Sequence, residues 1–221
     1  MWRVVAIVAI VVSMPAWCVA EDKVPLDTTL PEEVLAGTPP DVLAILFPEL
    51  EKPPEAKPEL LVPKGTKNLA LDKPVTSSDM NPLLGELKFI TDGDKEGTER
   101  SFVELGPMKQ WIQIDLGQPA EIYAVYLWHF FREARSYHDV AVQVAADADF
   151  TQDVKTVYSN DQDNSLKLGI GKDRPYIETF MGKLIDAKGV KGRFVRIYSA
   201  GNTANDLNHY VEVEVHGLAA K

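Results

Sequence analysis

The chain has 221 residues, one cysteine and a net charge of −10, with 33 acidic against 23 basic residues. Nucleic acids and anionic membrane surfaces require a basic surface on their partners, so we expect neither as a ligand of this acidic chain. A single cysteine excludes an intramolecular disulfide and a cysteine-rich zinc site. The length suits one domain that buries its own core.

The first 20 residues have the layout of a secretory signal peptide. Arg3 precedes an unbroken apolar run from Val4 to Val12, and Ala20 lies directly before an acidic pair. A membrane span needs about 20 apolar residues, and Pro15 interrupts this run too early. We therefore expect cleavage near Ala20, no membrane span afterwards, and a protein that is secreted, periplasmic or in the cell envelope.

Residues 21–66 form a proline-rich acidic arm. Nine of the 15 prolines fall between residues 25 and 64. Each proline removes a backbone donor and restricts the residue before it, so long helices and strands are excluded. The composition predicts an extended, solvated linker.

Within this arm, the sequence predicts one short helix, at residues 39–47. Thr38 and Asp41 have the spacing of a helix cap, and Leu43, Leu46 and Phe47 then share one face with Leu50. Two interpretations remain open. The helix packs on its own domain, or it docks on an envelope or extracellular protein.

Residues 67–221 show the period-two alternation of β-strands. Candidate strands cover 111–116, 121–128, 140–145, 194–198 and 211–215, with turn residues rich in Gly, Asn and Asp between them. Several short strands without long helical periodicity indicate an all-β antiparallel sandwich. No nucleophile elbow, zinc-protease motif or dinucleotide fingerprint is present, so we expect no enzyme.

Two clusters of polar residues are candidates for ligand binding. Residues 91–98 gather oxygen donors in a turn with two glycines, which suits calcium or a solvated acidic turn. Residues 128–139 mix aromatic rings with arginine, histidine and aspartate, which suits a sugar site. The alternative is that Trp128, Phe130 and Tyr137 are core residues at a strand end and the charges are solvated. The amide-rich loop 199–210 lies before the final strand and could reach the same rim.

The order of five motifs along the chain resembles the coagulation factor V/VIII type C, or discoidin, family. The motifs begin at Asn68, Thr91, Trp111, Phe194 and Val211, and they span residues 67–217. The resemblance implies a galactose-binding-like jelly-roll sandwich, a fold shared with lectins and with bacterial modules that bind carbohydrate polymers.

The resemblance also implies a structural calcium ion near the ends of the domain. By position, Asp92 and Glu212 would supply carboxylates and Asp94 a carbonyl or side-chain oxygen. Thr98 (or Ser101) would supply a further oxygen. Phe89 and Val211 would contribute backbone carbonyls.

The prediction is a secreted, non-catalytic module that binds a carbohydrate or glycoconjugate. In related fucose-binding lectins an arginine follows the long central strand, and Arg135 falls near that position, although Trp128 stands where a second arginine would be expected. The alternative is a protein-interaction or adhesion domain. The residues predicted to contact the sugar are Trp128, His129, Arg132, Arg135, Tyr137, His138 and Asn205.

Overall fold

A computed structural model describes residues 22–34, 39–98 and 101–220 of the chain. The predicted signal peptide, residues 1–20, lies outside the described residues. No helix in the described ranges is long and apolar enough to cross a membrane. The helices and strands, in chain order, are β1 (Lys23–Pro25), α1 (Pro40–Leu46), β2 (Leu61–Pro63), β3 (Lys67–Asn68), β4 (Val75–Ser77), η1 (Leu87–Thr91), β5 (Val103–Leu105), β6 (Gln110–His129), β7 (Ala141–Ala145), β8 (Lys155–Ser159), β9 (Lys183–Ser199) and β10 (Asn208–Ala219).

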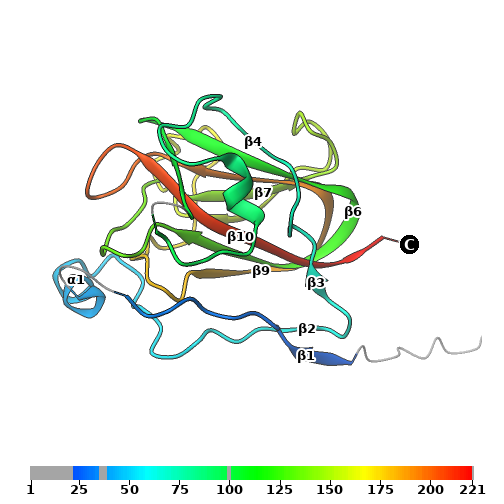
Figure 1. The fold of residues 1–221 in the computed structure, drawn as a ribbon, viewed down its shortest axis with the longest axis horizontal. Helices are drawn as coiled ribbons and strands as arrows, with labels where there is room; N and C mark the ends of the chain where they lie inside the picture. The colour runs from blue at the N-terminus through cyan, green and yellow to red at the C-terminus, as the bar shows by residue number, and fades with distance from the viewer. Residues whose placement is uncertain (1–21, 35–38, 99–100, 221) are drawn as a thin grey trace, which may run out of the picture.

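All strand pairs in the described residues are antiparallel, and the main path runs β3-β10-β6-β9-β7-β8 (Figure 1). β4 pairs with β6, and β5 pairs with β10. The long strands β6 and β9 pair on both sides of two register shifts, and residues of both strands contribute to the main core. This is the antiparallel β-sandwich that the alternation predicted.

One strand replaces the two that the sequence predicted around Gly117-Gln-Pro119. β6 continues from Gln110 to His129, and its pairing with β9 shifts register between Asp115 and Ala120. Gly117 has a φ of +85°, a conformation that costs glycine little. Pro119 falls in the same irregular stretch, where a missing ladder donor is tolerated. The turn residues therefore bend the strand and do not end it.

The arm is not the solvated linker that its composition predicted. β1 pairs with β2, and the two strands run along the outside of the layer that contains β9 and β10 (Figure 1). Leu26 and Val62 are buried in a second apolar cluster with Tyr126, Trp128 and Val211 of the sandwich. The arm therefore covers a sheet face that would otherwise be exposed.

The helix α1 projects from this otherwise docked arm. Val42, Ile45, Leu46 and Phe47 are exposed, so the helix does not bury an apolar face on its own domain. Its C-terminal side is fastened to the sandwich, because Arg174 donates to the carbonyl oxygens of Pro48 and Glu49.

Candidate functional site

Glu212 is a buried carboxylate that lacks a complete set of partners. Its Oε2 accepts a hydrogen bond of 3.1 Å from the backbone N–H of Gly93, whereas Oε1 has no partner. The side chain is fully buried on β10. Burial, together with the neighbouring carboxylates of Glu214 and Asp92, raises the pKa of Glu212 to about 9. Such a group needs either a proton or a cation.

Glu214, two residues further along the same strand, is buried but fully partnered. Lys95 Nζ lies 2.5 Å from its Oε1, and Thr28 Oγ1 and His216 Nε2 lie 2.7 and 2.9 Å from its Oε2. Burial alone would raise the pKa of Glu214, but the bonds from His216, Lys95 and Thr28 outweigh it and lower the pKa. Glu214 is therefore held as a carboxylate.

Alternation along β10 places these two glutamates on the same side, and a register shift between Tyr210 and Glu212 turns that side away from the main core. Beyond the shift, Val213 and Val215 face the main core. The opposite side, with Glu212 and Glu214, lies under the arm and the loop 92–98, so every residue from 208 to 217 is buried. The valine–glutamate alternation predicts a half-solvated strand, and the covering arm changes that outcome.

The residues around Glu212 suit a calcium ion in part. Glu212 Oε1 is buried without a hydrogen-bond partner, and carboxylate oxygens are the ligands that calcium prefers. The charge of Asp92 raises the pKa of Glu212. Phe89 lies in η1, which packs against β10, the strand that contains Val211. Asp94 and Thr98 are exposed. The backbone N–H of Asp94 donates to Asp92 Oδ1 and its side chain accepts from the backbone of Glu96, whereas Thr98 contacts Ser101. The structure thus assembles Asp92, Gly93 and Glu212, and it shows no contact from Asp94 or Thr98 to Glu212.

A second acidic group, Asp139, Asp161 and Asp163, is the one trio of carboxylates in the described residues whose ligand oxygens lie within 4.8 Å of one another. Asp161 is buried, but its two oxygens accept backbone N–H bonds from Ser165 and Leu166. These hydrogen bonds hold the loop 161–166 in place, which gives Asp161 a structural role without a metal ion. Glu212 has no equivalent explanation.

Trp128 does not form the exposed aromatic surface that the sugar prediction needs. Its ring is fully buried, stacks on Tyr126 with centroids 4.1 Å apart, and donates from Nε1 to the carbonyl oxygen of Phe180. Lys95 Nζ lies 4.8 Å from the ring centroid. A Cβ on Gly182 would lie 2.6 Å from Nε1, so this close contact requires the glycine. The ring packs the second apolar cluster.

His129 and Tyr137 are also interior residues. His129 Nδ1 lies 2.7 Å from Oε1 of the buried Glu178, and the imidazole stacks on the Tyr137 ring. The Tyr137 hydroxyl bonds His209 Nδ1 at 3.0 Å. Burial, together with the charges of Arg135 and His129, lowers the pKa of His209 to about 4, so His209 is neutral at pH 7. These side chains orient the loop from inside and leave no face for a sugar.

The remaining predicted contacts lie on a rim where two loops are hydrogen-bonded together. His138 N–H donates to the carbonyl oxygen of Gly201, and the backbones of Ser136 and Thr203 are linked in the same way. His138 and Asn205 are exposed and Arg132 is half-buried. The loop 130–139 and the loop 200–208 therefore form one surface, as the sequence suggested. We call this surface the rim.

Arg135 lies beneath the rim and is 5% exposed. Its Nη2 is 2.7 Å from Glu133 Oε2, and its guanidinium lies 4.7 Å from the half-buried Phe130 ring. Nε has no partner. Arg132 instead donates to the carbonyl oxygen of Glu96, which connects the rim to the loop 92–98.

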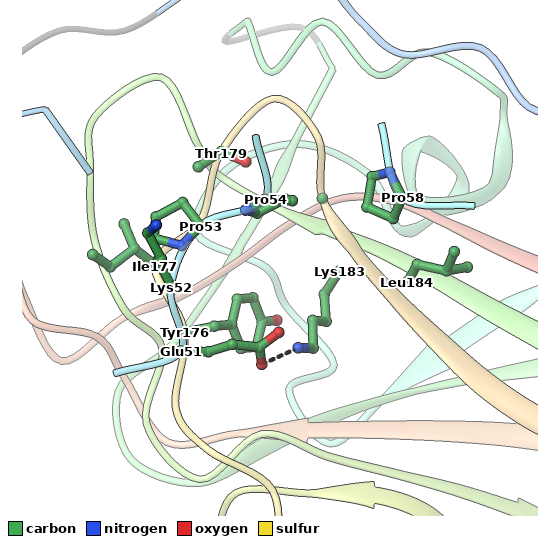
Figure 2. A pocket seen from close by; sticks show the side chains of 11 residues that line it. Glu51, Lys52, Pro53, Pro54, Pro58, Tyr176, Ile177, Thr179, Lys183 and Leu184 are labelled. Atoms are coloured by element: carbon green, nitrogen blue, oxygen red, sulfur yellow. Dashed lines mark hydrogen bonds and ion pairs between the residues drawn. The ribbon is translucent and has the colours of Figure 1, made fainter. Parts of the chain in front are cut away.

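A pocket of about 190 Å³ lies between the arm and the start of β9 (Figure 2). Pro53, Pro54 and Pro58 of the arm line it opposite Tyr176 and Lys183 of the sandwich. The Lys183 ammonium pairs with the Glu51 carboxylate and lies 5.0 Å from the Tyr176 ring centroid. The pocket therefore combines an apolar proline side with the polar groups of Glu51, Tyr176, Thr179 and Lys183.

Sequence reasoning missed the residues that link the arm to the glutamates. Thr28, Lys95 and Glu214 form a buried polar network, and Glu178 is the buried partner of His129. The signal that could have indicated the network is the repeat of Glu212 and Glu214 in a strand, since both side chains must share one face. Nothing in the local sequence indicates that Thr28 reaches this face.

No family model matches the chain, and no curated protein sequence matches it. Among solved structures, a family 89 glycoside hydrolase from Clostridium perfringens is similar, with a TM-score of 0.53 and 17% identity over 69% of this chain. The match covers 15% of the length of that hydrolase.

Two further structures have lower TM-scores. A fucose-binding module from Streptococcus pneumoniae gives 0.46, with 21% identity over 67% of this chain and 96% of the module. A fucolectin from striped bass (Morone saxatilis) serum gives 0.49, with 18% identity over 71% of this chain and 50% of the lectin. The chain therefore shares its fold with the matched part of that hydrolase, and the antiparallel β-sandwich expected from the sequence is confirmed.

Proposed function

We propose that this chain is a secreted, non-catalytic carbohydrate-binding module that holds a structural calcium ion beside Glu212. The observation that carries the binding role is the rim, where two loops of a galactose-binding-like sandwich are joined by backbone bonds. Arg132, His138 and Asn205 present donors and acceptors on this surface, which matches the hydrogen-bonding groups of sugar hydroxyls. The resemblance to the discoidin family supports the same ligand class.

Affinity electrophoresis against neutral and acidic polysaccharides tests the binding role. We expect retention by at least one polysaccharide, and His138→Ala should weaken it about tenfold, the equivalent of one lost hydrogen bond of about 1.4 kcal/mol. Lys191→Ala, an exposed residue paired with Glu121, is the matched control and should bind as wild type. A folded protein that no polysaccharide retains would refute the role.

The pocket at the arm is a second place where a saccharide unit could bind, and one variant separates it from the rim. Lys183→Met removes the ammonium that faces the pocket but leaves the rim untouched. Under the rim proposal, this variant keeps wild-type affinity for the polysaccharide that His138→Ala binds weakly. If Lys183→Met lost affinity and His138→Ala did not, the sugar-binding site would be the pocket and not the rim.

The calcium ion would be held by the free Oε1 of Glu212 and the carboxylate of Asp92. Carbonyl and hydroxyl oxygens of the predicted set, Phe89, Asp94, Thr98 and Val211, would complete six to eight ligands. The ion would neutralise a buried cluster that otherwise keeps Glu212 protonated. EDTA should lower the melting temperature, because a ligand of the folded state alone stabilises that state.

A second candidate function is docking on an envelope or extracellular protein through α1. The exposed Val42, Ile45, Leu46 and Phe47 favour it, since an amphipathic helix binds a partner groove by such anchors. Deletion of residues 39–47 should abolish capture of that partner and leave polysaccharide retention unchanged. The opposite pattern would exclude the docking role.

A further inference from the structure

Lys95 is a buried ammonium that belongs to the loop 92–98 and is held largely by the arm. The residue is 7% exposed. Its Nζ contacts Glu214 Oε1 at 2.5 Å, Thr28 Oγ1 at 3.0 Å and the carbonyl oxygen of Thr29 at 2.9 Å. An ammonium has three donors, and these contacts use all of them. Two of the three acceptors come from the arm.

The arm segment that supplies these acceptors is itself fixed on the sandwich. Leu26 is buried against the second apolar cluster, and Lys57 donates to the carbonyl oxygen of Thr28. Thr28 Oγ1 also bonds Glu214 Oε2 at 2.7 Å. The position of Lys95 is therefore set by the docked arm together with Glu214.

Glu212 Oε1 is an unsatisfied acceptor in the same buried region. Gly93, two residues before Lys95, donates to Glu212 Oε2, and Lys95 itself contacts Glu214 on the same strand, so its charge opposes the rise in the Glu212 pKa. A buried ammonium that loses acceptors is costly, and a lysine side chain can rotate to find another. Without Thr28 and Thr29, Lys95 would have two donors free, and the unpartnered oxygen of Glu212 lies on the same buried face of β10 as Glu214.

We propose that the arm holds Lys95 on Glu214 and thereby keeps Glu212 open for the calcium ion, so that docking of the arm and binding of calcium are coupled. The inference rests on the calcium site proposed above. Released from the arm, Lys95 would pair with Glu212 Oε1 and compete with the cation for that oxygen. By linkage, calcium in turn stabilises the docked arm by the same free energy.

The test is calorimetric titration of the full chain with CaCl₂, using two adjacent threonines as a matched pair. Thr28→Val removes the Oγ1 that Lys95 contacts, whereas Thr29→Val keeps the backbone carbonyl that it contacts. We expect Thr28→Val to bind calcium about tenfold more weakly, within the usual range of couplings between sites. Thr29→Val should bind as wild type.

Lys95→Met decides whether the effect passes through the ammonium. Without a competing cation, Thr28→Val should no longer change calcium affinity on the Lys95→Met background. An equal loss on that background would overturn the proposal, because the threonine would then act by another route. This comparison also controls for misfolding, since a general disruption would weaken both backgrounds.

The reciprocal measurement is hydrogen exchange of arm amides with and without calcium. The amides of residues 26–30 should exchange more slowly in calcium, and the protection should shrink in Thr28→Val. If wild type binds no calcium, both the calcium site and the coupling fail. If wild type and Thr28→Val bind calcium equally, the coupling alone fails and the calcium site stands.

Discussion

Glu212 and Glu214 lie two residues apart on β10, both buried, yet their surroundings move their pKa values in opposite directions. Glu214 accepts bonds from Lys95, Thr28 and His216, and its pKa is lowered. Glu212 accepts one bond from Gly93, leaves Oε1 unpaired, and has a pKa raised to about 9. Burial is common to both, so the number of donors decides the charge state.

These two glutamates show how a buried carboxylate with a structural role differs from one that is available to bind a ligand. A buried carboxylate with a complete set of donors fastens parts of the chain together, here the arm, the loop 92–98 and β10. A buried carboxylate with one free oxygen is poised for a ligand that the protein does not supply.

The largest expected effect is the loss of Glu214. Glu214→Gln leaves the Lys95 ammonium buried without its counter-charge, which typically costs about 3–5 kcal/mol of unfolding free energy. Urea unfolding monitored by tryptophan fluorescence measures it, with Glu121→Gln, whose partner Lys191 is exposed, as the control. A loss below about 1 kcal/mol would show that Glu214 is no structural anchor.

Calcium should stabilise the protein through Glu212. At a free concentration 100 times the dissociation constant, the ion adds about 2.7 kcal/mol of unfolding free energy. For a domain of this size that corresponds to a rise of about 5–10 °C in the melting temperature. Glu212→Gln should remove the rise in a thermal scan. Persistence of the full shift in this variant would place the ion elsewhere.

The pH dependence of the metal-free protein should also come from Glu212. Because its folded-state pKa of about 9 lies above the usual 4.5, the folded protein keeps a proton that the unfolded chain releases. This contribution is complete below pH 4.5 and is lost as the pH rises towards 9.

Between pH 7 and pH 9, we expect a loss of about 2 kcal/mol of unfolding free energy in EDTA. The loss should disappear in Glu212→Gln and in wild type saturated with calcium. Urea unfolding at the two pH values measures it. A metal-free wild type that is equally stable at both values would contradict the unpartnered state of Glu212.

The smallest expected effect is that of Thr28→Val on stability. Removing its hydroxyl breaks one bond to Glu214 and one to Lys95, which together contribute about 1–2 kcal/mol. Thr29→Val should change the unfolding free energy by less than about 0.5 kcal/mol, as surface substitutions do. Equal stabilities of the two variants would weaken the view that the arm takes part in the Glu214 network.

The sandwich could be predicted from sequence because its strands carry their own local signals. Val140, Val142 and Val144 alternate with smaller or polar residues, and the structure has β7 there, packed in the main core. The short helix expected at 39–47 appears as α1, with boundaries one residue inside the expected range. Such local patterns span only a few residues, so they can be recognised without knowledge of the tertiary structure.

The position of the arm could not be predicted in this way. Its prolines describe a backbone that forms little regular structure, but they say nothing about which surface it covers. Leu26 and Thr28 meet Trp128 and Glu214 across a long separation in sequence, and no pattern along the chain encodes that meeting. The sequence left Trp128 open between a sugar-binding aromatic and a core residue at a strand end, and the structure shows a core residue.

The most direct test of the account is a crystal structure grown in calcium chloride, with anomalous scattering used to identify the ion. We predict an ion bonded to Glu212 Oε1 and Asp92, with Lys95 still on Glu214 and Thr28. Glu212 Oε1 bonded instead to Lys95 or to an ordered water, with no anomalous peak beside it, would contradict the account.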